Sequence, residues 1–310
     1  MSVAIDVHTH LAPVAAALTD PGVTVDAERI VIDGQTVGVA DLYRPAALVD
    51  YLDHAGFASA WVSAPPPFYR QDLAADRCAQ WVQDVHAGLV EACAQSGRLR
   101  PIAYLPLEHP EVAIERYQAV RHQNTVVTAA AGGGSVRLDD AALAPLWQAM
   151  NADQGVLLLH PGSTPDHRLA AHYQENLTGN PTETAIALSQ LIFGNVLSAH
   201  QQLRIVTVHC AGTMPMLAGR WQRGIDTKRP GLPEPAVDLP AALRQIWFDS
   251  IAHDPAAMAL AVQVLGADRL VPGSDWPFPM GSGDPLADIA ACDATLVQQA
   301  IDTVAQLATA

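Results

Sequence analysis

The sequence predicts an α/β protein built as a (β/α)8 barrel with a small β insertion after the first strand. Eight runs rich in valine, isoleucine and leucine recur along the 310 residues and are typical of buried strands. Helical patterns separate these runs, and alternation of strands and helices predicts parallel pairing. The length fits one barrel domain covering residues 1–310. The predicted strands are residues 3–8, 59–63, 99–105, 125–130, 155–160, 203–209, 245–249 and 269–274.

The segments between the strands are mostly helical. Thr182 and Asp254 are predicted N-caps, and Pro255 follows at the first helical position. Residues 11–45 are too long for an ordinary βα connection and contain a valine-rich piece with an Asp-Gly turn. We therefore predict that they form a small β insertion near the barrel mouth. The predicted helices are 73–96, 110–122, 139–151, 182–197 and 254–265.

Composition limits the possible partners and compartments. The formal net charge of −15 argues against nucleic acid or an anionic membrane as a partner, because both would be repelled. No stretch reaches the roughly 18 apolar residues of a membrane span, and the first residues lack the features of a signal peptide. Four scattered cysteines predict free thiols. We therefore expect a cytoplasmic protein.

The lysine content narrows the possible chemistry. Lys228 is the only lysine, and it lies far from any predicted strand end. This position argues against a Schiff-base lysine and against a phosphate-loop lysine.

Four histidines and one aspartate stand where apolar runs stop: His8, His10, His160, His209 and Asp275. The carboxyl ends of the strands in a parallel barrel form its catalytic face, so these side chains are expected to converge. Residues i and i+2 share one side of a strand, which lets His8 and His10 bind the same cation. With His160 and Asp275 they form a credible ligand set for zinc or a similar divalent ion. The alternative is a set of separately hydrogen-bonded core histidines.

His209 is assigned a different role. A catalytic metal site keeps one open coordination position, and an imidazole beside it is suited to general acid or base chemistry. We therefore predict that His209 transfers protons. The alternative is a fifth ligand, or a ligand of a second metal.

In chain order, these motifs resemble the amidohydrolase superfamily, in its aminocarboxymuconate-semialdehyde decarboxylase (ACMSD) branch. The resemblance covers nearly the whole chain and implies a distorted (β/α)8 barrel with one divalent metal, often zinc and sometimes manganese. It implies His8, His10, His160 and Asp275 as ligands, with Asp275 also catalytic, and His209 as the acid/base residue. Binuclear members bridge their metals with a lysine or carboxylate of the fourth strand, and TVVTAAAGGG offers neither. The motifs are HTH, LLLHP, GNPTETAIALSQLIFGNVL, VHCAGTMPMLAGR, WFDSIAHDPAA and GADRLVPGSDWPFP.

Residues outside the metal cluster are expected to bind the substrate. Arg220 matches an arginine that in similar decarboxylases reaches a substrate carboxylate across a dimer interface, which implies a homodimer. A guanidinium holds both carboxylate oxygens at once. The alternative for Arg220 is a position on the surface of an amphipathic helix.

Aromatic and basic side chains near the strand ends are further candidates. Tyr69 and Arg70 follow the second strand, and Trp276 and Phe278 flank Asp275. Their alternatives are a rigid loop and plain core packing. Asp249 ends the seventh strand and is expected to orient an imidazole, or else to form a local turn with Ser250.

The branch contains decarboxylases, hydratases and hydrolases, so the reaction is weighed separately from the fold. Gln174 replaces a tryptophan of the muconate decarboxylases, and the block around His209 reads His-Cys-Ala-Gly rather than His-Gly-Gly-Gly. These departures favour a cyclic or aromatic monoacid over an acyclic diacid. We predict nonoxidative decarboxylation of a small aromatic or unsaturated cyclic carboxylic acid, with proton transfer by His209 and a metal-bound water. The alternatives are a mononuclear hydrolase of an amide, lactone or ester, a hydratase, and a metal-binding module without turnover.

Overall fold

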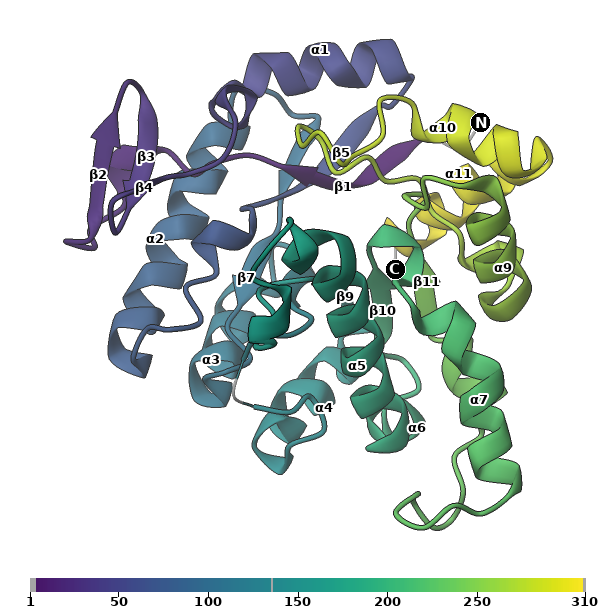
Figure 1. Ribbon diagram of the computed structural model, residues 1–310. Helices are drawn as coiled ribbons and strands as arrows, with labels where there is room; N and C mark the ends of the chain where they lie inside the picture. The colour runs from purple at the N-terminus through teal and green to yellow at the C-terminus, as the bar shows by residue number, and fades with distance from the viewer. Residues whose placement is uncertain (1–3, 135, 309–310) are drawn as a thin grey trace.

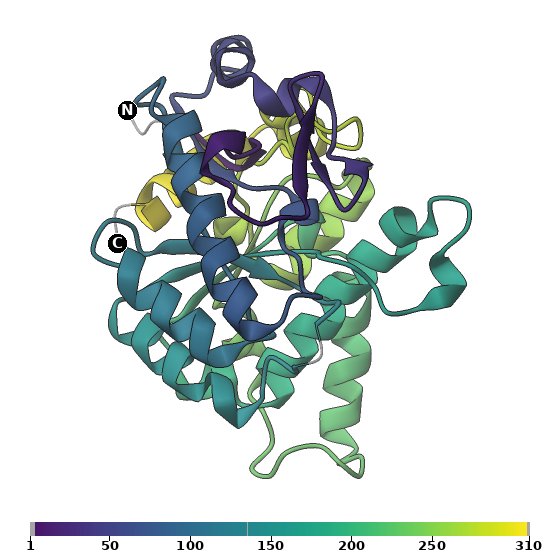
Figure 2. The same cartoon turned by 90° about the vertical axis from the view of Figure 1, so that its left-hand side faces the viewer.

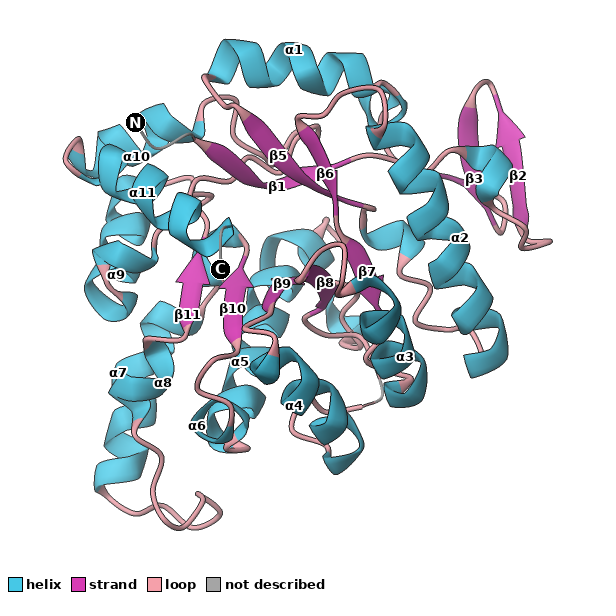
Figure 3. Cartoon of the chain, turned by 180° about the vertical axis from the view of Figure 1, so that it is seen from behind, coloured by secondary structure: helices cyan, strands magenta, loops and turns pink. Residues whose placement is uncertain are grey.

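Parallel strands around a packed centre form the middle of the molecule (Figures 1 and 3). The computed structural model describes residues 4–134 and 136–308. One sheet has the order β1–β5–β6 and a second has the order β11–β10–β9–β8–β7, with parallel pairing throughout. The strands are β1 (Ile5–His10), β5 (Ser59–Ser63), β6 (Leu99–Pro101), β7 (Ala103–Leu105), β8 (Val126–Ala130), β9 (Val156–His160), β10 (Arg204–Thr207) and β11 (Ile246–Phe248).

The two sheets meet at both of their edges. On one side β6 runs directly into β7, and Ile102 between them donates its N–H to the carbonyl of Val62 at 2.9 Å. On the other side residues 270–276, here called the closing segment, make isolated parallel bridges to β11 and β1. The N–H of Val7 reaches the carbonyl of Pro272 at 3.1 Å. The predicted strand 99–105 is therefore split at Ile102, and the eighth position of the ring is held by bridges rather than by a regular strand.

Apolar side chains fill both surfaces of the strands, which explains why β9 and its neighbours are continuous apolar runs. Val7, Leu158 and Val206 pack together in one cluster inside the ring. Leu157 and Leu159 point the other way and pack with the helices. The helices are α1 (Pro45–Ala55), α2 (Ala75–Cys93), α3 (Pro110–Val120), α4 (Ala144–Ala152), α5 (Asn180–Phe193), α6 (Val196–Ala199), α7 (Met214–Asp226), α8 (Leu239–Leu243), α9 (Pro255–Leu265), α10 (Pro285–Asp293) and α11 (Leu296–Ala308).

One of the two predicted helix caps is confirmed. The carboxylate of Asp254 accepts the N–H groups of Ala256 and Ala257 at the start of α9. Thr182 lies inside α5 instead, and its hydroxyl donates to the carbonyl of Thr178 at 2.7 Å. The prediction for Thr182 was wrong because α5 begins two residues earlier than the apolar pattern suggests.

The predicted β insertion is confirmed. It is an antiparallel sheet of β2 (Val23–Asp26), β3 (Arg29–Ile32) and β4 (Gln35–Thr36). Its Ile30 and Ile32 pack with Phe68, Tyr69 and Trp81, so the insertion covers the segment that follows β5. Among the described residues, no helix is both long and apolar enough to cross a membrane.

Candidate metal centre and active site

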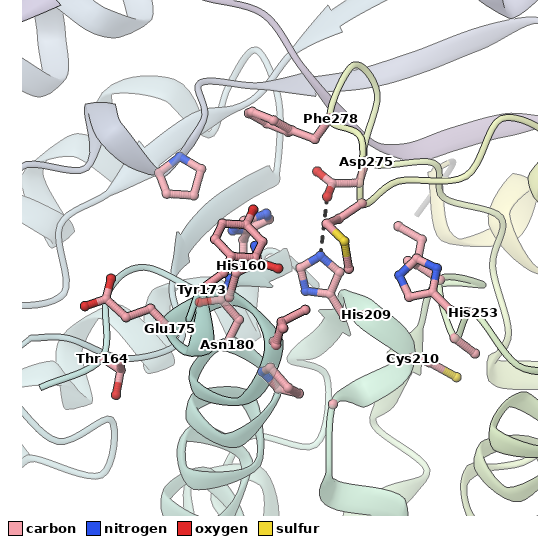
Figure 4. A pocket seen from close by; sticks show the side chains of 18 of the residues that line it. His160, Thr164, Tyr173, Glu175, Asn180, His209, Cys210, His253, Asp275 and Phe278 are labelled. Atoms are coloured by element: carbon pink, nitrogen blue, oxygen red, sulfur yellow. Dashed lines mark ion pairs between the residues drawn. The ribbon is translucent and has the colours of Figure 1, made fainter. Parts of the chain in front are cut away.

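The ends of three strands and the closing segment bring the predicted side chains together. His8 and His10 end β1, His160 ends β9, His209 follows β10, and Asp275 lies in the closing segment. The ring centres of His8 and His10 are 5.1 Å apart, and each lies 5.0 Å from that of His160. The His209 ring centre is 5.3 Å from that of His8 and 5.6 Å from that of His160. Figure 4 shows His160, His209 and Asp275 facing one space.

Four buried polar atoms in this cluster have no hydrogen-bond partner. They are the Nε2 atoms of His8, His10 and His160 and the Oδ1 atom of Asp275. Leaving one such atom buried and unpaired costs about 1–3 kcal/mol, so four together point to a ligand that pairs with them all. Three imidazole nitrogens and one carboxylate oxygen are a suitable donor set for a divalent metal ion. The residues present therefore fit the predicted metal.

The opposite nitrogen of each ring is held by a neighbour. His8 Nδ1 lies 2.8 Å from Asp249 Oδ2, and His10 Nδ1 lies 3.0 Å from the Ser63 hydroxyl. His160 Nδ1 lies 2.7 Å from the carbonyl of Pro161. Such contacts fix the ring orientation and leave Nε2 free for a metal. The hydrogen bond predicted for Asp249 is present.

The two oxygens of Asp275 face different partners. Oδ1 lies 3.4 Å from His8 Nε2 and 3.1 Å from His10 Nε2, whereas Oδ2 lies 3.6 Å from His209 Nε2. One ligand atom from each of His8, His160, His209 and Asp275 also falls within a mutual distance of 4.8 Å. Distance alone therefore allows His209 as a ligand. Its side chain, however, is 20% exposed, whereas those of His8 and His10 are fully buried.

Burial and charge set the protonation of the cluster. Burial would raise the pKa of Asp275, but the charge of His8 and the close imidazoles of His10 and His209 hold it well below the ordinary value. Burial and the neighbouring imidazoles lower the pKa of His160 well below its ordinary value. Burial also opposes a charge on His8, yet Asp275 and Asp249 raise its pKa. An ionised Asp275, a neutral His160 and a field that favours positive charge all suit a bound cation.

The turn that carries His209 has an uncommon backbone. His209, Cys210 and Ala211 have φ values of 53°, 53° and 62°, and Asp275 has a φ of 57°. Left-handed φ at non-glycine residues stores strain and gathers at functional sites. Asp249 holds this turn, since its Oδ1 accepts the Cys210 N–H at 2.9 Å.

A pocket of about 950 Å³ opens over the cluster. His160, His209 and Asp275 line its floor, and Phe278 lines a wall next to His10, with ring centres 5.4 Å apart. No arginine or lysine of the described residues lines this pocket. The remaining lining includes Pro66, Pro67, Thr164, Tyr173, Glu175, Asn176, Leu177, Asn180, Cys210, Met216, Ile251 and His253.

Two predicted substrate-binding aromatic residues lie away from the pocket lining. Tyr69 is only 1% exposed and stacks on Tyr104 with ring centres 4.2 Å apart, behind His160. Trp276 stacks on Tyr51 at 6.3 Å. Neither is among the residues that line the pocket.

The predicted arginines, Arg70 and Arg220, also lie outside the pocket. Arg70 is held by Asp33 at 3.0 Å and by Asp72 at 3.3 Å, so its charge is already paired. Arg220 is exposed on α7. Figure 2 shows α7 and the loop after it extending beyond the rest of the molecule.

Sequence reasoning missed two contributors to the site. Ser63 ends β5, and its strand-end position was the signal that could have found it. The wall formed by Tyr173 and residues 175–177 carries no such signal, because it depends on the backbone. His172 and Tyr173 have φ values of 59° and 60°, and a π-helix spans Glu175–Gly179. Single π turns often occur at functional sites.

Comparison with known proteins gives both a family and relatives. The family model described as "Amidohydrolase" matches residues 5–305. A 2-amino-3-carboxymuconate-6-semialdehyde decarboxylase of Dictyostelium discoideum is 31% identical over 149 residues, which are 46% of this chain and 41% of that protein. The chain thus spans less than half the length of this curated relative.

Solved structures share the fold. The apo form of Metarhizium anisopliae IDCase superposes with a TM-score of 0.82 at 20% identity, covering 99% of this chain and 97% of the other. A second match is a Novosphingobium aromaticivorans 5-carboxyvanillate decarboxylase complexed with manganese and 4-hydroxy-3-methoxy-5-nitrobenzoic acid. It superposes with a TM-score of 0.73 at 19% identity, covering 83% of this chain and 78% of the other. This likeness confirms the predicted α/β barrel class.

The family match starts in β1, which carries His8 and His10, and runs past Asp275 into α11. It thus includes every residue that carries an unpaired ligand atom in the cluster. The motifs that predicted the family and the matched range agree, and this chain belongs to the amidohydrolase family.

Proposed function

We propose that this protein is a metal-dependent nonoxidative decarboxylase of a small aromatic or unsaturated cyclic carboxylic acid. The observation that carries the proposal is the set of four unpaired ligand atoms beside a pocket that His160, Asp275 and His209 line. The decarboxylase names of the Dictyostelium relative and of the Novosphingobium structure support the same class.

His8, His10, His160 and Asp275 would hold the metal, and we propose zinc, with manganese as the other candidate. Imidazole-rich sites suit zinc, while manganese is the ion of the Novosphingobium enzyme. When bound, a divalent ion supplies a Lewis acid that draws electron density from an oxygen of the substrate.

His209 is proposed to deliver the proton. When the bond to the carboxylate carbon breaks, its electron pair stays on the substrate carbon and carbon dioxide leaves. That carbon then takes a proton from the His209 imidazolium, which solvent later restores. Asp275 Oδ2, 3.6 Å from Nε2, stabilises the charged ring before transfer.

The pocket walls support a flat substrate with one carboxylate. Phe278, Pro66 and Leu177 give apolar surface for a ring, and Glu175 adds negative charge. A second carboxylate would meet no arginine or lysine in this chain's described lining, which disfavours a diacid.

The test uses purified metal-loaded protein and a panel of hydroxybenzoates, muconates, lactones and amides. A decarboxylase releases carbon dioxide, whereas a hydrolase forms a new carboxylate without it. His209→Asn should lower kcat by about 10²–10⁴-fold, because only the proton donor is lost. Its metal content should match that of the wild type. Substantial retained turnover would contradict the role of His209.

We also propose a homodimer in which Arg220 completes the neighbouring site. Arg220 is exposed on the protruding α7, a position that suits contact with a second copy. Mixing Arg220→Ala subunits with His209→Asn subunits tests this idea. If Arg220 acts across the interface, mixed dimers contain one intact site and regain activity that neither parent shows. No recovery after confirmed subunit exchange would exclude the shared site.

We further propose that residues 1–310 act as one domain, with 11–45 as an insertion near the mouth, in the cytoplasm. All four cysteines are free and three of them are buried, which suits a reducing compartment.

A further inference from the structure

A second pocket, of about 610 Å³, lies at the opposite end of the barrel from the metal cluster. The first residues of β6 and of β8 line it, whereas the metal cluster lies where strands end. The two sheets separate at Ile102, because β6 before it and β7 after it belong to different sheets. A 3.4 Å hydrogen bond from the Asn124 amide to the Pro101 carbonyl joins the two sides. Residues of both β6 and β7 line the pocket, which lies where the two sheets separate. Figure 3 shows this separation of β6 from β7.

The lining of this pocket is basic, although the chain carries a net charge of −15. Arg100, Arg121, His86 and His122 line it, and no aspartate or glutamate of the described residues does. Arg121 is paired with Asp153 at 3.1 Å. Arg100 is exposed and forms no ion pair within the described part of the chain, so its guanidinium is available to a ligand.

Polar atoms beside the pocket are left unpaired. Nδ1 of His86 and Nε of Arg116 are buried without a hydrogen-bond partner. Burial and the charge of Arg116 lower the pKa of His86 to about 4, so positive charge already crowds this region. An anion in the pocket would offset this positive charge and accept a hydrogen bond from His86, which lines the pocket.

We propose that this pocket binds a small phosphate monoester, separately from the metal centre. Guanidinium forks match the oxygens of a phosphate group. The cavity is much larger than a phosphate ion, and Val90, Leu99 and Val120 line it with apolar surface for the rest of the ligand.

Calorimetric titration with phenyl phosphate tests the site, on both metal-loaded and chelator-treated full-length protein. One binding event is expected in both forms. Arg100→Gln should weaken it by about tenfold or more, because a charged hydrogen-bonding partner is lost. The affinity of Arg100→Lys for phenyl phosphate should fall between those of the wild type and Arg100→Gln, because lysine keeps the charge but lacks the forked geometry of the guanidinium. Arg229→Gln removes an exposed arginine outside the pocket and should leave the affinity for phenyl phosphate unchanged.

The outcomes separate this site from the metal centre. Binding only to the metal-loaded form, equal affinity in Arg100→Gln, or no binding to the wild type would each overturn the proposal. Inorganic phosphate should bind more weakly than phenyl phosphate, and equal affinity would overturn the assignment to an ester. Circular dichroism of Arg100→Gln should match the wild type because the side chain is exposed.

Discussion

Asp249 holds two parts of the site at once. Its Oδ2 accepts from His8 Nδ1, and its Oδ1 accepts the N–H groups of Cys210 and Ile251. Asp249→Asn should lower metal affinity by about 10–100-fold, because the carboxylate that orients His8 is lost. Metal analysis after dialysis against graded chelator measures this. Asp140→Asn, at an exposed cap, is the control, and an unchanged affinity in Asp249→Asn would contradict the role.

Glu108 offers a stability prediction away from the metal. Both carboxylate oxygens are buried without a partner, and burial raises the pKa of Glu108 above its ordinary value. The raised pKa means that protonated Glu108 stabilises the fold at low pH, and this contribution is lost as pH rises through the folded-state pKa.

Glu108→Gln should therefore gain stability relative to the wild type as pH rises above the ordinary carboxyl range. The difference should grow by up to about 1.4 kcal/mol per pH unit until the folded-state pKa is passed. Urea unfolding of the chelated protein at several pH values measures it. Parallel profiles for the two proteins would contradict the prediction.

At the residue scale, strand-end position was enough to find side chains that meet at the cluster. His8, His160 and Asp275 each follow an apolar run, and the ring geometry then forces them together. Arg70 shows the limit of this reasoning. Its partner Asp33 lies in the insertion, and the ion pair exists only after that sheet packs on the segment after β5.

The turn 209–212 is the element whose backbone matters most. Gly212 has a φ of 58°, and a Cβ there would meet the Pro181 carbonyl oxygen at 2.3 Å. Gly212→Ala should cost about 1–3 kcal/mol of unfolding free energy and lower activity, because the turn must shift away from α5. Gly219→Ala is the control, since nothing lies within 4 Å and a helical alanine gains about 0.5–1 kcal/mol. Urea unfolding measures the stability of both variants. An unchanged unfolding free energy in Gly212→Ala would contradict the prediction, because it would show that the turn relaxes without cost.

A strand could be predicted from the sequence where its own apolar run is enough to define it. The run VLLLH is buried along its whole length and forms β9. Residues 99–105 were also predicted as one strand, yet Ile102 bonds to β5 while Ala103 pairs with β8, so two sheets divide the segment. That division depends on neighbours far along the chain, which no local pattern contains.

The whole molecule should depend on the metal for stability. The proposed ligands come from β1 in one sheet, from β9 in the other and from the closing segment, so a bound ion joins the two sheets. Saturating zinc or manganese should raise the unfolding midpoint by roughly 5–10 °C over chelated protein. Differential scanning calorimetry measures the shift. His160→Gln should lose it, and His253→Gln, which changes a pocket histidine outside the cluster, should keep it.

The closing segment gives the cluster a further property. His8, His10 and His160 precede the exposed loop around residue 231, and Asp275 follows it. If that loop were cut, each fragment would keep an incomplete set of donors, and neither could bind the ion as the intact chain does. Reassembly of the two pieces should then require the metal, which would make the barrel a metal-controlled split protein.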